Sequence, residues 1–288
     1  MRASALVLSC LACAGPAVAP VYAQTIVQPG LYRDARSAAY LFAASSADAR
    51  TLWVNPGGLG IRLEASVMGE IVVERDLGSG DYSIAQYSAG FNSRGVSFGY
   101  RRDRFDSAGG NTFRLGAGRA MGRIAVGAAL SLYSGDPDQR ELDLGLRYAL
   151  TPTIEIGTVM RHILRPVVRQ TPIPVTGTAG LHWQVGAGLG LDAEATAADR
   201  FAGSGFDMSY RAGVQFGGGR LPALLLANVD LDSDLGIGRF VAGLAVGGAD
   251  RGVLIGDMVR TAGTTRLSAI SLAGIATRSL VGPNRRSR

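Results

Sequence analysis

The chain has 288 residues and a formal net charge of +6, with 47% hydrophobic, 18% charged and 7% aromatic residues. This composition excludes a disordered or low-complexity protein. Because its apolar residues are mostly dispersed Ala, Leu and Val rather than long apolar blocks, it also argues against a helical membrane protein. The arginines lie singly along the chain except in the tail Arg285-Arg286-Ser287-Arg288, so we expect no nucleic-acid partner.

Residues 1–23 have the features of an export signal. A basic start and the apolar stretch Ala5–Val18 precede Val21-Tyr22-Ala23, which is typical of a cleavage site. Both cysteines, Cys10 and Cys13, lie inside this segment, so the mature chain would have no thiol for a disulfide, a metal or catalysis. A lipoprotein signal acylated at one of these cysteines is the alternative, but such a signal needs a longer apolar stretch before the cysteine.

Residues 24–60 show no strand periodicity. The Ala- and Ser-rich stretch Ala35–Ala49 is compatible with short helices, and Asn55-Pro56-Gly57-Gly58 predicts a chain reversal. The simplest interpretation of this motif is an ordinary turn that leads into the first strand.

From about residue 62 the hydrophobic pattern has a period of two. Between Glu141 and Leu150, for example, one face carries Leu142, Leu144, Leu146, Tyr148 and Leu150, and the other carries charged or very small residues. The pattern predicts fourteen strands, at 62–74, 82–91, 94–101, 112–119, 123–133, 141–150, 153–162, 173–182, 185–195, 206–216, 222–230, 237–246, 252–260 and 266–276.

The links between these strands alternate between short and long up to residue 205. Such alternation, an even strand number and strands of about ten residues are typical of an all-β, up-and-down transmembrane β-barrel of antiparallel strands. Closure leaves no unpaired edge in lipid. A soluble β-sandwich or solenoid is the alternative, but fourteen strands with one apolar face each would need a very large two-sheet core.

The segment before the first strand resembles the entry segment of FadL-type outer-membrane proteins, the family of long-chain fatty-acid transporters. The resemblance rests on a run of small residues, Asp48, the aromatic Trp53, and Asn55-Pro56-Gly57-Gly58-Leu59. It implies a fourteen-stranded barrel with a hatch inside it and an Asn-Pro-Ala motif near the lumen wall, where Gly57 replaces the usual Ala. PorV/PorQ-like barrels, associated with secretion and surface attachment, share this signature.

These observations predict a signal peptide at 1–23, a short N-terminal hatch or plug at 24–60, a barrel at 61–277 and a basic tail at 278–288. With the apolar faces toward lipid, ten charged residues would face the lumen. They are Arg114, Glu141, Asp143, Arg147, Glu155, Arg161, Asp192, Glu194, Asp207 and Arg211. The structural interpretation is that they pair and hold the hatch and the strand register; the functional one is a polar conduction path.

Signals for catalysis are weak. Only His162 and His182 could act as a general base of the usual kind, and neither lies beside a Gly-x-Ser-x-Gly motif, which leaves a Ser/His barrel hydrolase a remote alternative. Asp230, Asp232 and Asp234 are spaced as in a calcium loop, but the glycine comes one place late and no glutamate follows at the twelfth position. We therefore expect a protein that is not an enzyme, with no catalytic residue, metal or cofactor.

The resulting hypothesis is an outer-membrane barrel of FadL-like type that passes small hydrophobic molecules inward by diffusion, with the Asn55-Pro56 turn as hinge or gate. The alternative is a PorV-like barrel that docks secretion or surface-attachment proteins. Expected partners are membrane lipid and lipopolysaccharide, with either a hydrophobic small molecule or a secretion-system protein.

Overall fold

The computed structural model describes residues 32–62, 64–76, 78–105, 108–134, 139–168, 171–200, 205–217, 222–261 and 264–279. The predicted signal peptide, residues 24–31 of the predicted hatch, and residues 280–288 of the predicted basic tail lie outside these ranges.

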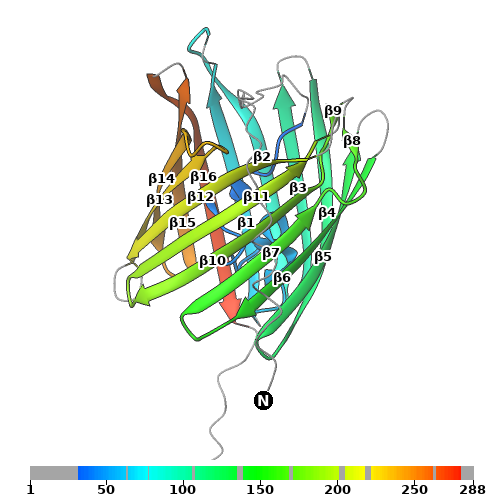
Figure 1. The fold of residues 1–288 in the computed structure, drawn as a ribbon, viewed down its shortest axis with the longest axis vertical. Helices are drawn as coiled ribbons and strands as arrows, with labels where there is room; N and C mark the ends of the chain where they lie inside the picture. The colour runs from blue at the N-terminus through cyan, green and yellow to red at the C-terminus, as the bar shows by residue number, and fades with distance from the viewer. Residues whose placement is uncertain are drawn as a thin grey trace, which may run out of the picture.

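The described chain forms a closed barrel of fourteen antiparallel strands in which each strand pairs with its neighbours along the chain, and β1 pairs with β16 to close the ring (Figure 1). The barrel strands are β1 (Glu64–Arg75), β2 (Tyr82–Ser93), β3 (Val96–Phe105), β4 (Ala108–Met121), β5 (Ile124–Ser134), β6 (Gln139–Ala149), β7 (Ile154–Arg161), β10 (Thr176–Gly186), β11 (Leu189–Asp199), β12 (Phe206–Gly217), β13 (Ala223–Leu231), β14 (Ile237–Gly247), β15 (Asp250–Thr261) and β16 (Thr264–Ser279). The two-residue strands β8 (Val167–Val168) and β9 (Thr171–Pro172) pair with each other outside the barrel sheet.

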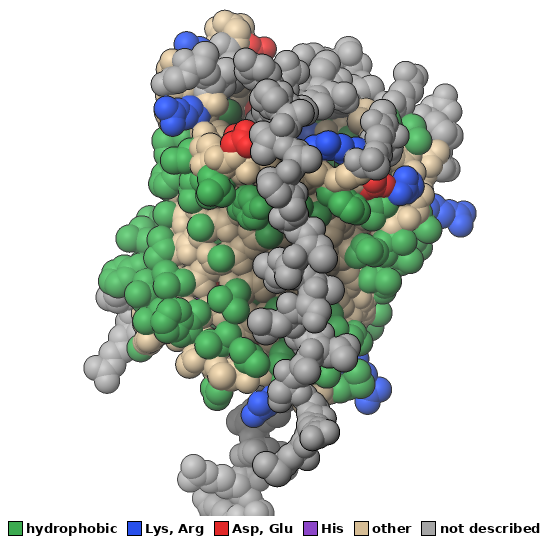
Figure 2. Space-filling model, in the orientation of Figure 1, with side chains coloured by type: hydrophobic (Ala, Val, Ile, Leu, Met, Phe, Trp, Pro, Cys, Tyr) green, Lys and Arg blue, Asp and Glu red, His purple; other side chains and the backbone are tan. Residues whose placement is uncertain are grey.

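The wall follows the alternation of the sequence. In β6, Leu144 and Leu146 are 47% and 38% exposed on the outside, whereas Asp143 and Arg147, which flank this pair, are buried on the inside. Hydrophobic side chains cover the visible wall, and charged ones gather toward its two ends (Figure 2). Because an apolar outer band suits hydrocarbon rather than water, the predicted transmembrane barrel is confirmed as the fold.

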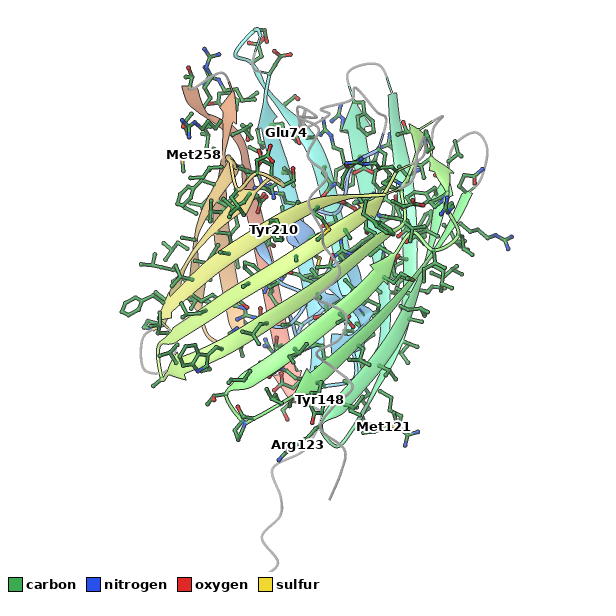
Figure 3. The ribbon with its side chains drawn as sticks, in the orientation of Figure 1. Glu74, Met121, Arg123, Tyr148, Tyr210 and Met258 are labelled. Atoms are coloured by element: carbon green, nitrogen blue, oxygen red, sulfur yellow. The ribbon has the colours of Figure 1, made fainter. Side chains whose placement is uncertain are left out.

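The two ends of the barrel differ in their connections. At the end where β1 begins and β16 ends, which we call the turn end, β2–β3, β4–β5, β10–β11 and β14–β15 are joined by two residues each. At the opposite loop end β3–β4 and β15–β16 are equally short, but the connection from β7 to β10 has fourteen residues. Figure 3 shows Met121, Arg123 and Tyr148 near this end, and Glu74 and Met258 toward the opposite loop end. In barrels of this architecture, short turns face the periplasm.

Several strand boundaries differ from the prediction. The turn between β10 and β11 falls at residues 187–188 instead of 183–184, so Val185 continues β10 and does not begin a strand. β3 and β4 extend to Phe105 and Ala108, where the sequence predicted a ten-residue loop. Polar residues in these outer parts obscured the alternation, because a strand that extends past the hydrocarbon no longer needs an apolar outer face.

Residues 32–62, which we call the luminal segment, lie inside the barrel. The segment contains the short helices α1 (Ser37–Tyr40) and α2 (Thr51–Val54) and the 3-10 turn η1 (Pro56–Gly58). It runs from the loop end, where Arg33 pairs with Glu74, to the turn end, where Gly60 lies against Arg119. No helix in the described ranges is long and apolar enough to cross a membrane.

Candidate functional site in the barrel lumen

The Asn55-Pro56-Gly57 turn is fixed to the inner wall. The Asn55 side chain donates from Nδ2 to the carbonyl oxygens of Ala43 (2.8 Å) and Leu146 (3.2 Å), and its Oδ1 accepts from the Gly57 N–H at 2.9 Å. A Cβ on Gly57 would lie 2.7 Å from the backbone nitrogen of Leu146, and one on Gly145 would lie 2.0 Å from Asn55 Oδ1. Glycine on both sides therefore permits this contact, and the Gly at position 57 has a steric reason.

Trp53 is packed in the lumen against the inner faces of β3 and β4. It is 3% exposed, and the guanidinium groups of Arg101 and Arg114 each lie 5.5 Å from its ring. A Cβ on Gly99 of the wall would come within 2.6 Å of the same ring. Cation–π contacts of desolvated arginines stabilise such an arrangement, so Trp53 ties α2 to β3 and β4.

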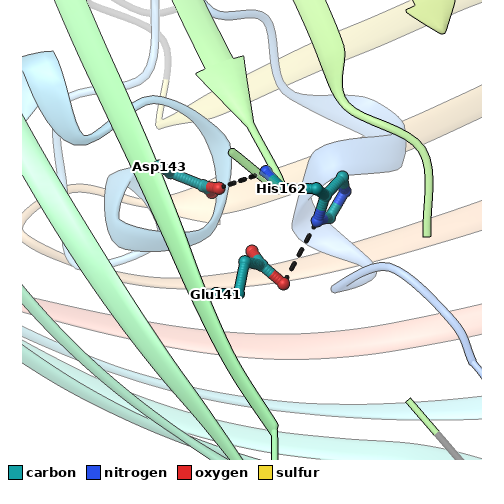
Figure 4. Close-up of side chains that lie close together, drawn as sticks. All are labelled: Glu141, Asp143 and His162. Atoms are coloured by element: carbon teal, nitrogen blue, oxygen red, sulfur yellow. Dashed lines mark hydrogen bonds and ion pairs between the residues drawn. The ribbon is translucent and has the colours of Figure 1, made fainter. Parts of the chain in front are cut away.

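A dense ionic cluster closes the loop-end part of the lumen. Arg114 contacts both Glu141, at 3.2 Å, and Asp143; Tyr133 donates to Glu141; and His162 Nδ1 lies 3.1 Å from Glu141 Oε2. The backbone N–H of His162 donates to Asp143 at 3.0 Å (Figure 4). The cavity among these side chains is only about 10 Å³, so this part of the lumen is filled.

The ligand atoms of Glu141, Asp143 and His162 lie within 4.8 Å of one another, a spacing at which they could hold a metal ion. Arg114 already bonds to both carboxylates, so its guanidinium supplies the positive charge that a metal would bring. Burial alone would lower the pKa of the His162 imidazole, but the hydrogen bond and charge of Glu141 outweigh it and raise that pKa above its ordinary value. A cationic histidine also opposes metal binding.

A second charged chain runs along β11–β15 on the opposite inner wall. Arg211 pairs with Glu194 at 3.0 Å and Asp230 at 2.7 Å, and Arg239 pairs with Asp230 at 2.9 Å. Arg211 also donates to the carbonyl of Ala38 at 2.8 Å. Through Arg211, this chain of pairs contacts the first half of the luminal segment.

The turn end has a looser arrangement. Asp48 accepts from Arg50 at 2.6 Å and from Arg251 at 2.9 Å, and a cavity of about 180 Å³ opens beside them. Burial alone would raise the pKa of the Asp48 carboxyl, but Arg50 and Arg251 hold it well below its usual range. Asp48, singled out in the sequence as part of the entry motif, is therefore an ionic link between the luminal segment and β15.

The structure brings nine of the ten predicted lumen charges to the inner face. Besides the pairs above, Arg147 contacts Glu155, Arg161 donates to the Val54 carbonyl at 2.6 Å, and Asp192 lies 2.9 Å from His182. Asp207 differs: it is 68% exposed beside Arg200 at the loop-end rim, because the first residues of β12 project beyond the enclosed lumen.

Sequence reasoning missed several charges in the luminal segment and on the inner face of the barrel. Arg36, Arg101, Asp103, Arg239 and Asp257 are all in the lumen, and Asp230 belongs to the Arg211 chain instead of a calcium loop with Asp232. Asp232 instead accepts from the N–H groups of Asp234 and Gly236 and closes the hairpin. Extending the position parity set by the apolar outward residues of each strand could have found the strand residues among them, although in β3 Asp103 lies between Arg102 and Arg104.

No protein-family profile matches the sequence, and neither does any curated protein. Solved structures do match. The toluene transporter TbuX of Ralstonia pickettii has a TM-score of 0.58 and 11% identity, covering 81% of this chain and 95% of that one. The toluene transporter TodX of P. putida has a TM-score of 0.50 and 11% identity, covering 83% and 97%.

The chain therefore has the fold of FadL-type outer-membrane barrels, which confirms the resemblance found in the entry segment at the level of architecture. Both neighbours are toluene transporters, and that this chain is not an enzyme stays a prediction. The PorV-like alternative finds no counterpart among them and stays a prediction.

Proposed function

We propose that the protein resides in the outer membrane and admits small hydrophobic molecules by passive diffusion. Two features together carry this proposal. The closed barrel has an apolar outer face, and the luminal segment is bonded to the inner wall from one end to the other. Bilayer lipid and lipopolysaccharide would contact the outer face, where Ile71 and Leu115 are about half exposed. The shared fold of TbuX and TodX supports the choice of hydrophobic cargo.

Passage requires the luminal segment to move, because its side chains fill the loop-end part of the lumen. The Asn55-Pro56 turn is the natural hinge or gate. The Asn55 side chain holds it to β6 and to the preceding chain through one hydrogen bond each, and a third hydrogen bond, from the Gly57 N–H, closes the turn itself. Loss of that side chain frees the turn without removing any charge pair.

The test is toluene consumption by intact Gram-negative cells that metabolise toluene and lack other hydrocarbon channels. Cells that produce the barrel should consume toluene several-fold faster than cells that do not, and Asn55→Ala should change that rate at equal barrel abundance. Asn111→Ala is the matched control, because Asn111 bonds to Tyr100 on the outer face of the wall. Equal consumption with and without the barrel would refute uptake; an Asn55→Ala rate equal to the wild type would remove the gate.

A further inference from the structure

Three arginines lie on the outside of the barrel at the turn end, on the hairpins formed by β2–β5. Arg94 lies in the turn between β2 and β3, Arg119 lies near the end of β4, and Arg123 lies in the turn between β4 and β5. All three residues are exposed, and Figure 3 shows Arg123 at this end of the barrel. We call these three residues the arginine patch.

Backbone contacts bring the two hairpins of the arginine patch together. The Gly118 N–H donates to the Gly95 carbonyl oxygen at 2.8 Å. Arg119 directly follows the first of these glycines and Arg94 directly precedes the second, so the two arginines flank this hydrogen bond. Arg123 lies in the two-residue turn that follows β4. The patch is therefore one group of positive charges on adjacent parts of the rim.

The charge of the arginine patch is not compensated. None of the three arginines forms an ion pair with a carboxylate in the part of the chain that the structure describes. The exposed carboxylates at the start of β1 and β15, Glu64 and Asp250, pair with Arg62 and Arg278 instead. Arg123 reaches only a backbone carbonyl oxygen, at 3.5 Å. A group of three unpaired cations attracts an anionic partner.

The backbone at Arg94 has a conformation that arginine rarely adopts. Arg94 has a φ of +50° and Gly95 a φ of +87°, so both central residues of this hairpin turn are left-handed. Asn, Asp or Gly is usual at the first of these positions, because most other side chains are strained there. Backbone strain of this kind is typical of functional positions. The arginine therefore has a role beyond forming the turn.

The wall next to the arginine patch is apolar. Val96, Met121 and Ile124 are large hydrophobic residues exposed at this end of the barrel. Arg119 has the same position parity as the outward Leu115 of β4, so it lies on the outer face with the apolar band. Arginine at such a boundary lays its methylene groups along apolar surface and its guanidinium in the headgroup layer. A lipid would contact both surfaces, whereas a soluble anion would contact the arginines alone.

We propose that the arginine patch binds the phosphate group of an anionic glycerophospholipid in the periplasmic leaflet, with the acyl chains against Val96, Met121 and Ile124. A guanidinium group donates two parallel hydrogen bonds to a phosphate, and clustered arginines beside the hydrocarbon layer attract anionic lipids. The short turns of this end face the periplasm in barrels of this architecture. The inference concerns the outer wall and is independent of what passes through the lumen.

Dioleoylphosphatidylglycerol and dioleoylphosphatidylcholine are suitable probes, because they share their acyl chains and a phosphate and differ in net charge. Native mass spectrometry of the purified, detergent-folded barrel should show a saturable complex with the anionic lipid at concentrations where the zwitterionic lipid binds little. Arg119→Gln should weaken the anionic complex about fivefold, and its combination with Arg94→Asn and Arg123→Gln about a hundredfold. Arg278→Gln is the matched control, because this exposed arginine at the same end already pairs with Asp250.

Arg94→Asn separates a binding role from a structural one. Asn tolerates the left-handed conformation, so this variant should bind the anionic lipid about fivefold more weakly while its urea midpoint does not fall. A lower midpoint with unchanged lipid affinity would overturn the assignment of Arg94.

Three other outcomes would overturn the proposal as a whole. They are equal binding of the two lipids by the wild type, equal affinity for the anionic lipid in the wild type and the triple variant, and a loss in Arg278→Gln as large as that in Arg119→Gln. The first of these would favour an acidic periplasmic protein as the partner of the arginine patch.

Discussion

Both ends of the lumen contain arginine–carboxylate pairs, but the empty space beside these pairs differs. At the loop end, Arg114 lies between Glu141 and Asp143, and only about 10 Å³ remains empty. At the turn end, Asp48 pairs with two arginines, Arg50 and Arg251, beside a cavity of about 180 Å³. One region is charge-balanced and filled, and the other is cationic and open.

This difference indicates which charges are structural. Buried ion pairs contribute to a fold mainly because removal of one partner leaves the other desolvated, and this condition holds at the loop end. At the turn end, Arg62 and Arg251 retain contact with solvent, with 58% and 31% exposed side chains, so the loss of a carboxylate partner there leaves a hydrated charge and not a desolvated one. The loop-end cluster thus acts as a lock on the luminal segment.

The largest expected effect is that of Arg114→Ala. The substitution leaves Glu141 and Asp143 buried without their cation and also removes a contact to Trp53, so the free energy of unfolding should fall by about 3–5 kcal/mol. Urea unfolding followed by the gel shift between folded and heat-unfolded barrel measures it. A loss below about 1 kcal/mol would show that the cluster is not a lock.

His162 makes the same cluster sensitive to pH. Its pKa is raised in the folded barrel, so its stabilising contribution is complete below the ordinary histidine pKa of about 6.5 and is lost as the pH rises through the folded-state value. His162→Gln should therefore be less stable than the wild type by about 1.5–3 kcal/mol at pH 5. The gap should narrow at pH 9. A gap that is constant from pH 5 to pH 9 would contradict a charged His162–Glu141 pair.

Much of the fold could be predicted from the sequence, because the period of two is a direct consequence of a wall with lipid on one side. The strand number of the barrel, its closure and the inward residues of β6 follow from that alternation. The β10–β11 turn was misplaced because Gly186, Gly188 and Gly190 carry no side chain by which to read a face. β8 and β9, at two residues each, are too short for any periodicity.

The site was less predictable, since contacts between the luminal segment and the wall depend on register across distant strands. Asn55 was singled out from its motif, but its bond to the Leu146 carbonyl, 91 residues away, has no signature in the sequence. Arg36 lay in a segment without periodicity, so its pairing with Asp257 could not be inferred. The cavity at the turn end could not be predicted either, because its lining residues come from the luminal segment and from strands far away in the sequence.

A glycine pair on the wall tests how tightly the turn is held. Gly145→Ala places a methyl group against Asn55 and Pro56, and overpacking of this kind costs about 1–3 kcal/mol. Gly69→Ala is the matched control, because nothing lies within 4 Å of the added carbon on the outer face of β1. In urea unfolding, the midpoint of Gly145→Ala should therefore lie below that of Gly69→Ala. Equal stability would show that the turn can shift away from β6 at no cost, and would weaken its assignment as a fixed gate.

The smallest expected effect concerns Asp207 at the loop-end rim. Its pair with Arg200 is 2.6 Å long, close in length to pairs inside the lumen, but the two side chains are 68% and 42% exposed. Exposed pairs are worth about 0–1 kcal/mol and are screened by salt. Asp207→Asn should therefore change the urea midpoint little, and 0.5 M salt should abolish what difference remains. This expectation holds if burial, and not contact distance, distinguishes the rim pair from the pairs of Arg114. A salt-resistant loss of stability as large as that of Arg114→Ala would contradict it and would place the rim pair in the same lock.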